Sequence, residues 1–282
     1  MENYPKRTWL VPWRLVHTGN YLRIMKVVTA RKMKERMFVE EGCIEEKRKL
    51  TTSLPWIMKQ TWSDVLFAHY PVPRKVLENL VPSGLTLDTF YQTGWVTIVP
   101  YLTSSMHLRG LPPIPGMAAF PGFNVRTYVT LNGKPGVYFF SLTASNFLAA
   151  YSAKTFFRLP YFHMNMYYKK AKELIIFESE KKSGLQLLCN YKSISAPSVA
   201  DKGSMEEWLV ERYCLYTVNE KGVPLRADIL HEPWLLERAE AEFQHNTLLK
   251  ALNIVPNYER PILHYAKKAV VRIWPIVQAE NK

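Results

Sequence analysis

The chain has 282 residues, of which 48% are hydrophobic and only 22% charged, so it is long enough to bury a core and too apolar for wholesale disorder. The formal net charge is +13, but no zinc finger, RNP-type aromatic motif or helix-turn-helix accompanies it, so we expect solvated basicity and no nucleic-acid partner. Three widely spaced cysteines exclude a disulfide framework, no metal site is indicated, and a reducing cytoplasm is the simplest location.

The first 54 residues differ from the rest of the chain. They hold 12 Lys and Arg against 6 Asp and Glu, which supplies +6 of the net charge. No apolar run in the chain reaches the roughly 18 residues of a membrane-spanning helix, and basic residues interrupt any signal-peptide core, so we expect no stable membrane insertion. We interpret residues 1–54 as a basic extension, with an amphipathic membrane-surface helix around Leu22–Val28 as the alternative.

A strand-rich domain is predicted to begin at Pro55. Four predicted strands share aromatic and β-branched residues between Pro and Gly: Trp56–Ser63, Val65–Tyr70, Leu85–Phe90 and Trp95–Tyr101. The last two flank a hairpin-like turn. A short helix at Arg74–Leu80 begins after Pro73. Residues 109–123 contain four prolines and three glycines, which predicts a long structured loop.

The clearest hairpin follows this loop. Val125–Leu131 and Val137–Thr143 alternate around Asn132-Gly133, a pair that readily adopts positive φ angles. A helix over Asn146–Phe157 comes next, with Ser145 as its N-cap. The remaining predicted elements are the strands His163–Tyr168, Glu173–Ser179, Leu185–Tyr191 and Tyr213–Val218, and the helices Met205–Val210 and Trp234–Phe243.

The order of these elements predicts one domain over residues 55–245. It is of the α+β class and mainly antiparallel β, with a barrel-like closure and a few packed helices. Residues 246–282 are expected to form a C-terminal tail or helix. The sequence leaves open whether copies of the chain associate as a homo-oligomer.

Arg126 is the most suggestive single residue. Alternation along Val125–Val129 places Arg126 and Tyr128 on one face of their strand. If that face lines the interior of a barrel, the guanidinium can clamp a carboxylate or phosphate through two parallel hydrogen bonds. The alternative is an arginine at a strand end that faces water or pairs with Asp64 or Asp88.

Other polar residues are candidates for proton transfer or ligand binding. His69 is interpreted as a general base, a hydrogen-bond donor to substrate, or a buried structural histidine. Tyr161 and His163 share one side of an extended segment and face either a ligand or solvent. Arg158 and Arg212 are further candidates for binding an anion.

The segment Lys154–His163 resembles the active-site element of acetoacetate decarboxylases, in which two lysines follow a proline and form and tune a Schiff base. Here Tyr161 and Phe162 follow Pro160. Four longer motifs resemble the YqjF-like bacterial proteins, also called the domain of unknown function 2071: Pro55–Trp62, Pro82–Asp88, Arg109–Gly116 and Phe123–Val129. This resemblance begins where the strand-rich texture begins and runs past Trp234.

The resemblance implies the acetoacetate decarboxylase-like fold, a curved antiparallel sheet that closes into a cone or barrel around a cavity. It places Arg126 where the decarboxylases carry a glutamate, which favours an anionic ligand. With no lysine at positions 161 and 162, it excludes decarboxylation through a Schiff base. We therefore expect a small anionic or carbonyl-containing metabolite as the ligand, and no cofactor.

Three function classes remain open at this point. An enzyme of this kind would have a lyase-like or hydratase-like activity that needs no Schiff-base lysine, which is an argument from fold alone. The second class is a non-catalytic small-molecule binding protein that uses the same interior. The third is a nucleic-acid or membrane-surface partner that is recruited through the basic extension.

Overall fold

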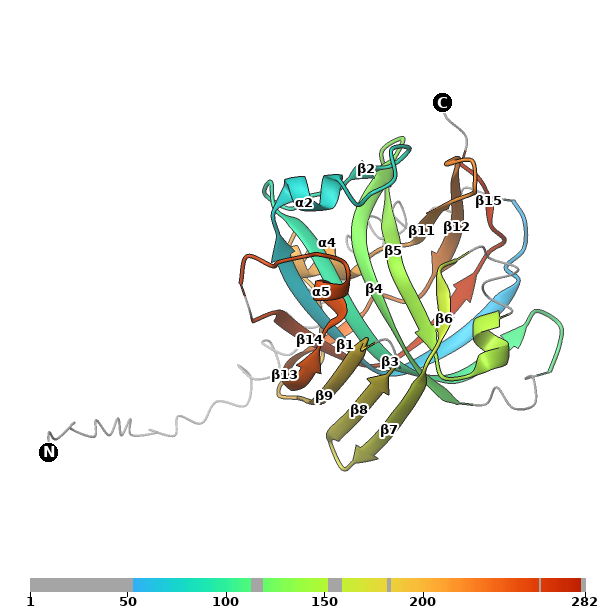
Figure 1. Cartoon of the computed structure of the whole chain (residues 1–282). Coiled ribbons are helices and arrows are strands. Elements are labelled where there is room, and N and C mark those ends of the chain that lie inside the picture. The colour runs from blue at the N-terminus through green and yellow to red at the C-terminus, as the bar shows by residue number, and fades with distance from the viewer. Residues whose placement is uncertain (1–52, 113–118, 152–158, 182–183, 259, 280–282) are drawn as a thin grey trace, which may run out of the picture. The chain divides into compact units, whose positions relative to one another are not determined.

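Seven strands pair edge to edge until the last meets the first (Figure 1). They are β1 (Met58–Val72), β3 (Gly94–Leu108), β4 (Phe120–Leu131), β5 (Lys134–Ala144), β11 (Cys214–Val218), β12 (Pro224–Leu230) and β14 (Ile262–Ile273). The pairing runs β12–β11–β5–β4–β3–β1–β14, and β14 pairs again with β12 through Ile229 and Ile273. Within the described residues these strands form a closed ring, and its pairs are antiparallel except β5 with β11.

The computed structural model describes residues 53–112, 119–151, 159–181, 184–258 and 260–279, which belong to one compact unit at Lys47–Lys282. The basic extension expected at 1–54 therefore lies almost wholly outside the described residues. Lys154, Arg158 and the centre of the predicted loop at 109–123 lie outside them as well.

Four strands continue the sheet beyond β14 and cover part of the outside of the ring. They are β13 (Leu235–Asn246), β9 (Gln186–Ser193), β8 (Leu174–Glu180) and β7 (Asn165–Ala171), paired in that order. Phe177, Leu187 and Tyr191 of this outer layer pack in one cluster with Leu66 of β1 and Ile98 of β3. The outer layer thus buries the outward face of the strands that carry the predicted functional residues.

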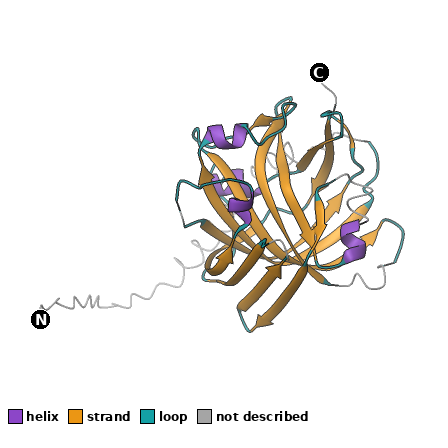
Figure 2. Ribbon diagram, viewed as in Figure 1, coloured by secondary structure: helices purple, strands orange, loops and turns teal. Residues whose placement is uncertain are grey.

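Short elements complete the fold (Figure 2). They are the strands β2 (Thr86–Leu87), β6 (Tyr161–His163), β10 (Ser198–Val199) and β15 (Val277–Gln278), and the helices α2 (Arg74–Glu78), α4 (Met205–Val210) and α5 (Leu248–Ala251). Residues 147–151 are helical, and the side chain of Asn146, rather than the predicted Ser145, accepts the capping hydrogen bond from the Ala149 amide at 3.0 Å. No helix in the part of the chain that the structure describes is both long and apolar enough to cross a membrane.

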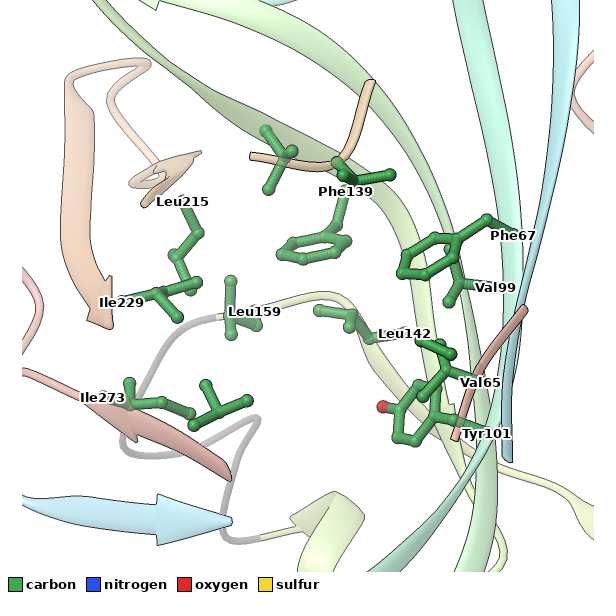
Figure 3. Packing of buried hydrophobic residues seen from close by; sticks show 14 of the residues in the cluster. Val65, Phe67, Val99, Tyr101, Phe139, Leu142, Leu159, Leu215, Ile229 and Ile273 are labelled. Carbon is green, nitrogen blue, oxygen red and sulfur yellow. The ribbon is translucent and has the colours of Figure 1, made fainter. Parts of the chain in front are cut away.

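Alternation along β1 divides its apolar residues between two cores. Val65 and Phe67 belong to the cluster inside the ring, whereas Leu66 and Ala68 belong to the cluster under the outer layer. Figure 3 shows the inner cluster converging from different strands: Val65 and Phe67 of β1, Val99 and Tyr101 of β3, Phe139 and Leu142 of β5, Leu215 of β11, Ile229 of β12 and Ile273 of β14. Because the inner core is mainly apolar, a buried polar group within the ring needs a specific explanation.

The predicted class is confirmed, since the described chain is mainly antiparallel strand with a few short helices. The predicted hairpin is also confirmed as β4 and β5, which pair from Leu131 and Lys134 outward. Its turn has φ angles of 51° at Asn132 and 75° at Gly133. These positive values match the right-handed twist of the flanking strands, which is why Asn-Gly marks such a turn.

Strand β1 is a single strand where two were predicted. It runs without interruption past Asp64, whose φ of 50° and the register shift against β3 between Ser63 and Ala68 mark a bulge. Asp64 is the residue that separates the two predicted strands, Trp56–Ser63 and Val65–Tyr70. Aspartate tolerates the left-handed conformation better than most residues, so the chain bends there and continues.

The prediction of a helix at Trp234–Phe243 is wrong, because strand β13 occupies this segment. Its Ala and Glu residues favour a helix intrinsically, but pairing with β9 and β14 prevails. Residues 246–282, expected to be a C-terminal tail or helix, contain the short helix α5 and the strand β14. In the ring, β14 lies between β1 and β12.

The region before β4 also differs from the prediction. A tight turn forms at Tyr91 and Gln92, both with positive φ, but β2 pairs with β4 and not with β3. The predicted loop ends early, because β4 already begins at Phe120. Proline at position 121 is compatible with a strand at this end, where β4 has only just joined its neighbours.

Candidate functional site

Polar side chains occupy one row across three neighbouring strands of the ring. His69 of β1 lies opposite Thr97 of β3, and Thr97 lies opposite Arg126 of β4. Directly opposed residues share a face of the sheet, and Phe67 and Val99 on that face belong to the inner core. The antiparallel register therefore brings a histidine, a threonine and an arginine together inside the ring.

Hydrogen bonds join His69 to two hydroxyl groups. The Nδ1 atom of His69 lies 2.8 Å from Oγ1 of Thr97, and this oxygen lies 2.6 Å from the hydroxyl of Tyr128. The Tyr128 hydroxyl is also 3.5 Å from His69 Nδ1. All three residues are fully buried, and the other ring nitrogen of His69, Nε2, has no hydrogen-bond partner in the described structure.

Arg126 carries a buried guanidinium that the protein satisfies only in part. The residue is 7% exposed, and its one hydrogen bond among the described residues is a long contact of 3.4 Å from Nη2 to the carbonyl of Leu209, near the C-terminal end of α4. Its charge lies 5.5 Å from the centroid of the Phe67 ring and 6.0 Å from that of Tyr128. The Nε–H group has no partner among the described residues.

Arg212 approaches the same tyrosine from the segment that follows α4. Its Nη1 atom forms an ion pair with Asp88 at 2.6 Å, and its Nε donates to the carbonyl of Trp208 at 2.8 Å. The guanidinium lies over the rings of Trp208 and Tyr128, at 4.4 and 5.0 Å. Burial lowers the pKa of Arg212 while Asp88 opposes that shift, and Nη2 has no partner in the described structure.

The electrostatic balance of this group is positive. Burial lowers the pKa of His69 well below its usual value, and the nearby His264 and Arg126 add to the effect. Burial also lowers the pKa of His264, which Glu206 opposes. Both imidazoles are therefore neutral at pH 7. Since Asp88 balances Arg212, the remaining charge belongs to Arg126, which has no carboxylate within ion-pair distance among the described residues.

The alternatives for Arg126 that the sequence left open do not hold in this structure. The side chain does not face water. Asp88 pairs with Arg212, and Asp64 pairs with Lys170 on the outer face of β1. His69 is buried, as one of its interpretations predicted. However, a buried structural histidine normally has hydrogen-bond partners on both ring nitrogens, and His69 Nε2 has none among the described residues.

Tyr161 and His163 do not join this group as a pair. Tyr161, on β6, packs against the inner core and shares a hydrogen bond with Tyr101, and burial raises its pKa to about 12. His163 is exposed, with Nε2 3.1 Å from the carbonyl of Ser145 and its ring beside Phe147. The interpretation of His163 as solvent-facing is thus the one that the structure supports, and Arg158 lies outside the described residues.

Sequence reasoning missed two members of the group and gave a third the wrong partner. Thr97 stands opposite His69, and the ring of His264 lies 5.4 Å from that of His69. Asp88, a possible partner of Arg126 in the sequence analysis, pairs with Arg212. Alternation from Trp95 would have placed Thr97 on the inner face of its strand. No local signal marked His264, because it lies in the segment predicted to be a tail or helix.

Comparison with known proteins identifies the relatives of this chain. The sequence profile of the DUF2071 family, described as an uncharacterized conserved protein, matches residues 59–269. The protein named "Uncharacterized protein YqjF" of Bacillus subtilis (strain 168) is 48% identical over 223 residues, which cover 78% of this chain and 92% of the relative. The profile match ends at residue 269, within β14, the strand that closes the ring.

Solved structures with the same fold have little sequence in common with the chain. An enduracididine biosynthesis enzyme, MppR, complexed with pyruvate, has a TM-score of 0.56 at 9% identity, covering 81% of this chain and 92% of that one. An acetoacetate decarboxylase from Legionella pneumophila has a TM-score of 0.53 at 10% identity, covering 83% and 94%. These similarities confirm the acetoacetate decarboxylase-like fold that the motifs predicted.

Proposed function

Because the chain belongs to the DUF2071 family and has the acetoacetate decarboxylase-like fold, we propose that it binds a small carboxylate-containing metabolite inside the strand ring. The observation that carries this proposal is the buried, unpaired charge of Arg126. An isolated cation in an apolar interior costs several kcal/mol, because the protein replaces only part of its hydration. An anionic ligand beside Arg126 would offset that cost.

The chemistry of the surrounding atoms favours an anion over a neutral or cationic ligand. Arg126 Nε and Arg212 Nη2 are donors without acceptors among the residues that the structure describes, and guanidinium groups bind carboxylates through parallel hydrogen bonds. His69 Nε2 is a third unpartnered nitrogen on the same side of the sheet. Phe67 beside Arg126 supplies an apolar wall, which suits a small organic acid more than a strongly hydrated inorganic ion.

We further propose that the ligand binds without forming a covalent bond to a lysine. None of the buried charged residues that the structure describes is a lysine, and the two positions that resemble the decarboxylase lysines are Tyr161 and Phe162. A Schiff base requires an amine whose pKa is lowered by burial or by a nearby cation. A reaction at this site would therefore be of the lyase or hydratase type without a covalent lysine intermediate.

Pyruvate is a suitable probe, since it is small, anionic and carbonyl-bearing. At about one hundred times its Kd, a ligand stabilises the folded state by about 2.7 kcal/mol, which corresponds to a rise in Tm of roughly 5–10 °C for a domain of this size. The uncharged methyl ester of pyruvate should give no such rise. Arg126→Met should abolish the effect of pyruvate.

A matched control comes from the same ring. Arg272 of β14 is exposed, so Arg272→Met removes a guanidinium without touching the interior, and the response to pyruvate should remain. An undiminished Tm rise in Arg126→Met would overturn the proposal. Borohydride with pyruvate should leave the mass of the protein unchanged, and an adduct on any lysine would contradict the non-covalent part.

Catalysis is tested separately from binding. If the site is that of an enzyme, turnover of pyruvate or acetoacetate should be detectable in the wild-type protein and lost in His69→Gln. Binding that depends on Arg126, without turnover of either compound, would assign the second function class, a non-catalytic binding protein.

A further inference from the structure

We propose that Thr97 and Tyr128 are positioning residues that hold His69 as the tautomer with its proton on Nε2, so that His69 presents a hydrogen-bond donor, and not a base, to the interior of the ring. This inference deepens the proposed function and rests on it for the role of the ligand. The tautomer itself follows from the hydrogen bonds among three buried side chains, whether or not a ligand is bound.

The argument begins with the two hydroxyl groups, each of which has one hydrogen. Oγ1 of Thr97 contacts both His69 Nδ1, at 2.8 Å, and the Tyr128 hydroxyl, at 2.6 Å. Thr97 has one hydrogen and two lone pairs, so it can donate in at most one of these hydrogen bonds and can accept in both. If Thr97 accepted from both neighbours, its own hydrogen would have no acceptor among the described residues.

One direction uses both hydroxyl hydrogens. Tyr128 donates to Thr97, and Thr97 donates to Nδ1 of His69, which must then be unprotonated. In the opposite direction Nδ1–H donates to Thr97 and Thr97 donates to Tyr128, which leaves the Tyr128 hydrogen without an acceptor among the described residues. A buried hydroxyl without an acceptor is strongly disfavoured, so the first direction prevails and the proton of the neutral ring lies on Nε2.

The consequence is that the unpartnered nitrogen atoms of His69, Arg126 and Arg212 are donors, whereas the unpartnered Oδ1 of Asn124, on the same face of β4, is an acceptor. His69 Nε2–H, Arg126 Nε–H and Arg212 Nη2–H have no acceptors in the described structure. Burial lowers the pKa of His69, and His264 and Arg126 add to that shift, which disfavours a second positive charge on the ring. The three donors favour an oxygen-rich anion as the ligand beside Arg126. In a reaction, His69 would act first as a proton donor to a ligand oxygen.

The tautomer can be observed directly. Long-range ¹H–¹⁵N spectra of protein labelled with ¹⁵N-histidine distinguish a protonated from an unprotonated ring nitrogen, and the His69 signals are those missing in His69→Gln. Ligand-free wild-type protein should show His69 with a protonated Nε2 and an unprotonated Nδ1. The reverse assignment would overturn the inference.

Variants of the two positioning residues test the direction of the hydrogen bonds among Tyr128, Thr97 and His69. Thr97→Val keeps the shape of the side chain but removes the donor, so His69 should lose its preference for one tautomer, and Thr97→Ser should restore it. Tyr128→Phe should leave Nε2 protonated, because Thr97 still donates to Nδ1. A switch of His69 to protonated Nδ1 in Tyr128→Phe would contradict the inference.

Measurements of pyruvate affinity distinguish a failure of this inference from a failure of the proposed function. Pyruvate affinity should fall roughly tenfold in Thr97→Val, the effect of losing one hydrogen bond to a charged acceptor, and return in Thr97→Ser. If wild-type His69 carries its proton on Nδ1 while pyruvate binding still depends on Arg126, the tautomer inference fails and the proposed function stands. If the tautomer is as stated but pyruvate does not bind, the proposed function fails alone.

Discussion

Two buried charged residues, Asp64 and Arg126, lie on opposite faces of the sheet formed by β1, β3 and β4, and their hydrogen-bond partners differ. On the outer face, the Asp64 carboxylate accepts hydrogen bonds from Tyr168 and Tyr265, both at 2.5 Å, and from Lys170 at 2.6 Å. A third tyrosine, Tyr191, donates to the Asp64 carbonyl at 2.7 Å. On the inner face, Arg126 has one long hydrogen bond and no ion pair among the described residues.

The difference separates a structural charge from the one that we propose binds a ligand. Asp64 joins the bulge of β1 to β7, β9 and β14, and every donor around it comes from this chain. These hydrogen bonds hold its pKa below the usual value even though burial acts in the opposite direction and is the largest single influence. Arg126 is not satisfied in this way, and such incomplete satisfaction is typical of functional sites.

The largest effect is expected from Asp64→Asn, which keeps the left-handed backbone conformation accessible but removes the charge. The amide nitrogen cannot accept the hydroxyl hydrogen bonds, and Lys170 loses its partner. We expect the free energy of unfolding to fall by about 3 kcal/mol in urea titrations at pH 7. Asp201→Asn, at an exposed aspartate, should change it by less than about 0.5 kcal/mol. If Asp64→Asn lowered the free energy of unfolding no more than this control, the structural role of Asp64 would be contradicted.

Arg126→Met should act in the opposite direction. Methionine fills similar volume without the cost of a buried, unpaired charge, so the free energy of unfolding should rise by roughly 1–3 kcal/mol. The same variant should lose the response to pyruvate, which is the usual exchange between stability and function. Arg272→Met serves again as the exposed control, with a change within about 0.5 kcal/mol. A clear destabilisation by Arg126→Met would show that Arg126 is structural, as Asp64 is.

The pH dependence of the free energy of unfolding should show whether His69, on the inner face, is buried as a neutral ring. The pKa of His69 is lowered on folding, so below about pH 6.5 the unfolded state binds a proton that the folded state does not. The free energy of unfolding should therefore decrease as the pH falls from 6.5 to 5.5, by up to about 1.4 kcal/mol per pH unit for this residue. His69→Gln should reduce the slope, whereas His163→Gln, at an exposed ring, should not. An unchanged slope in His69→Gln would mean that His69 is not buried as a neutral ring.

The smallest effect is expected from Lys170→Met on the outer face. The Lys170 side chain is 36% exposed, so solvent screens its ion pair with Asp64 and the contribution is less than about 1 kcal/mol. Tyr168 and Tyr265 continue to donate to the carboxylate. Urea unfolding of this variant beside Asp64→Asn separates the contribution of the ion pair from that of the hydroxyl groups. Equal losses in the two variants would show that the lysine, and not the tyrosines, holds Asp64.

Much of the inner face could be predicted because alternation is a local property. The pattern around Arg126 and Tyr128 placed both side chains on one face, and the structure puts that face inside the ring. His69 was likewise a candidate before any partner was known. Arg212 was a weaker candidate, because its place over Tyr128 depends on a segment that is not a strand.

The partners of these residues could not be predicted from the sequence. Asp64 and Asp88 were both plausible partners for Arg126, yet each pairs elsewhere. The choice depends on which face of β1 receives the outer layer and on where the segment after α4 crosses β4. Both are set by packing between residues that are more than one hundred positions apart.

The sequence by itself determined the family, the antiparallel character, the β4–β5 hairpin and the side of the strand on which Arg126 lies, because these follow from turn chemistry and from a period of two residues. Tertiary structure alone decided that β13 is a strand and that β14 closes the ring. It also decided that Arg126 has no ion pair within the described part of the chain, while Asp64 pairs with Lys170 and accepts from two tyrosines. Strand pairing and ion-pair partners are non-local, so neither propensity nor alternation within one segment can fix them.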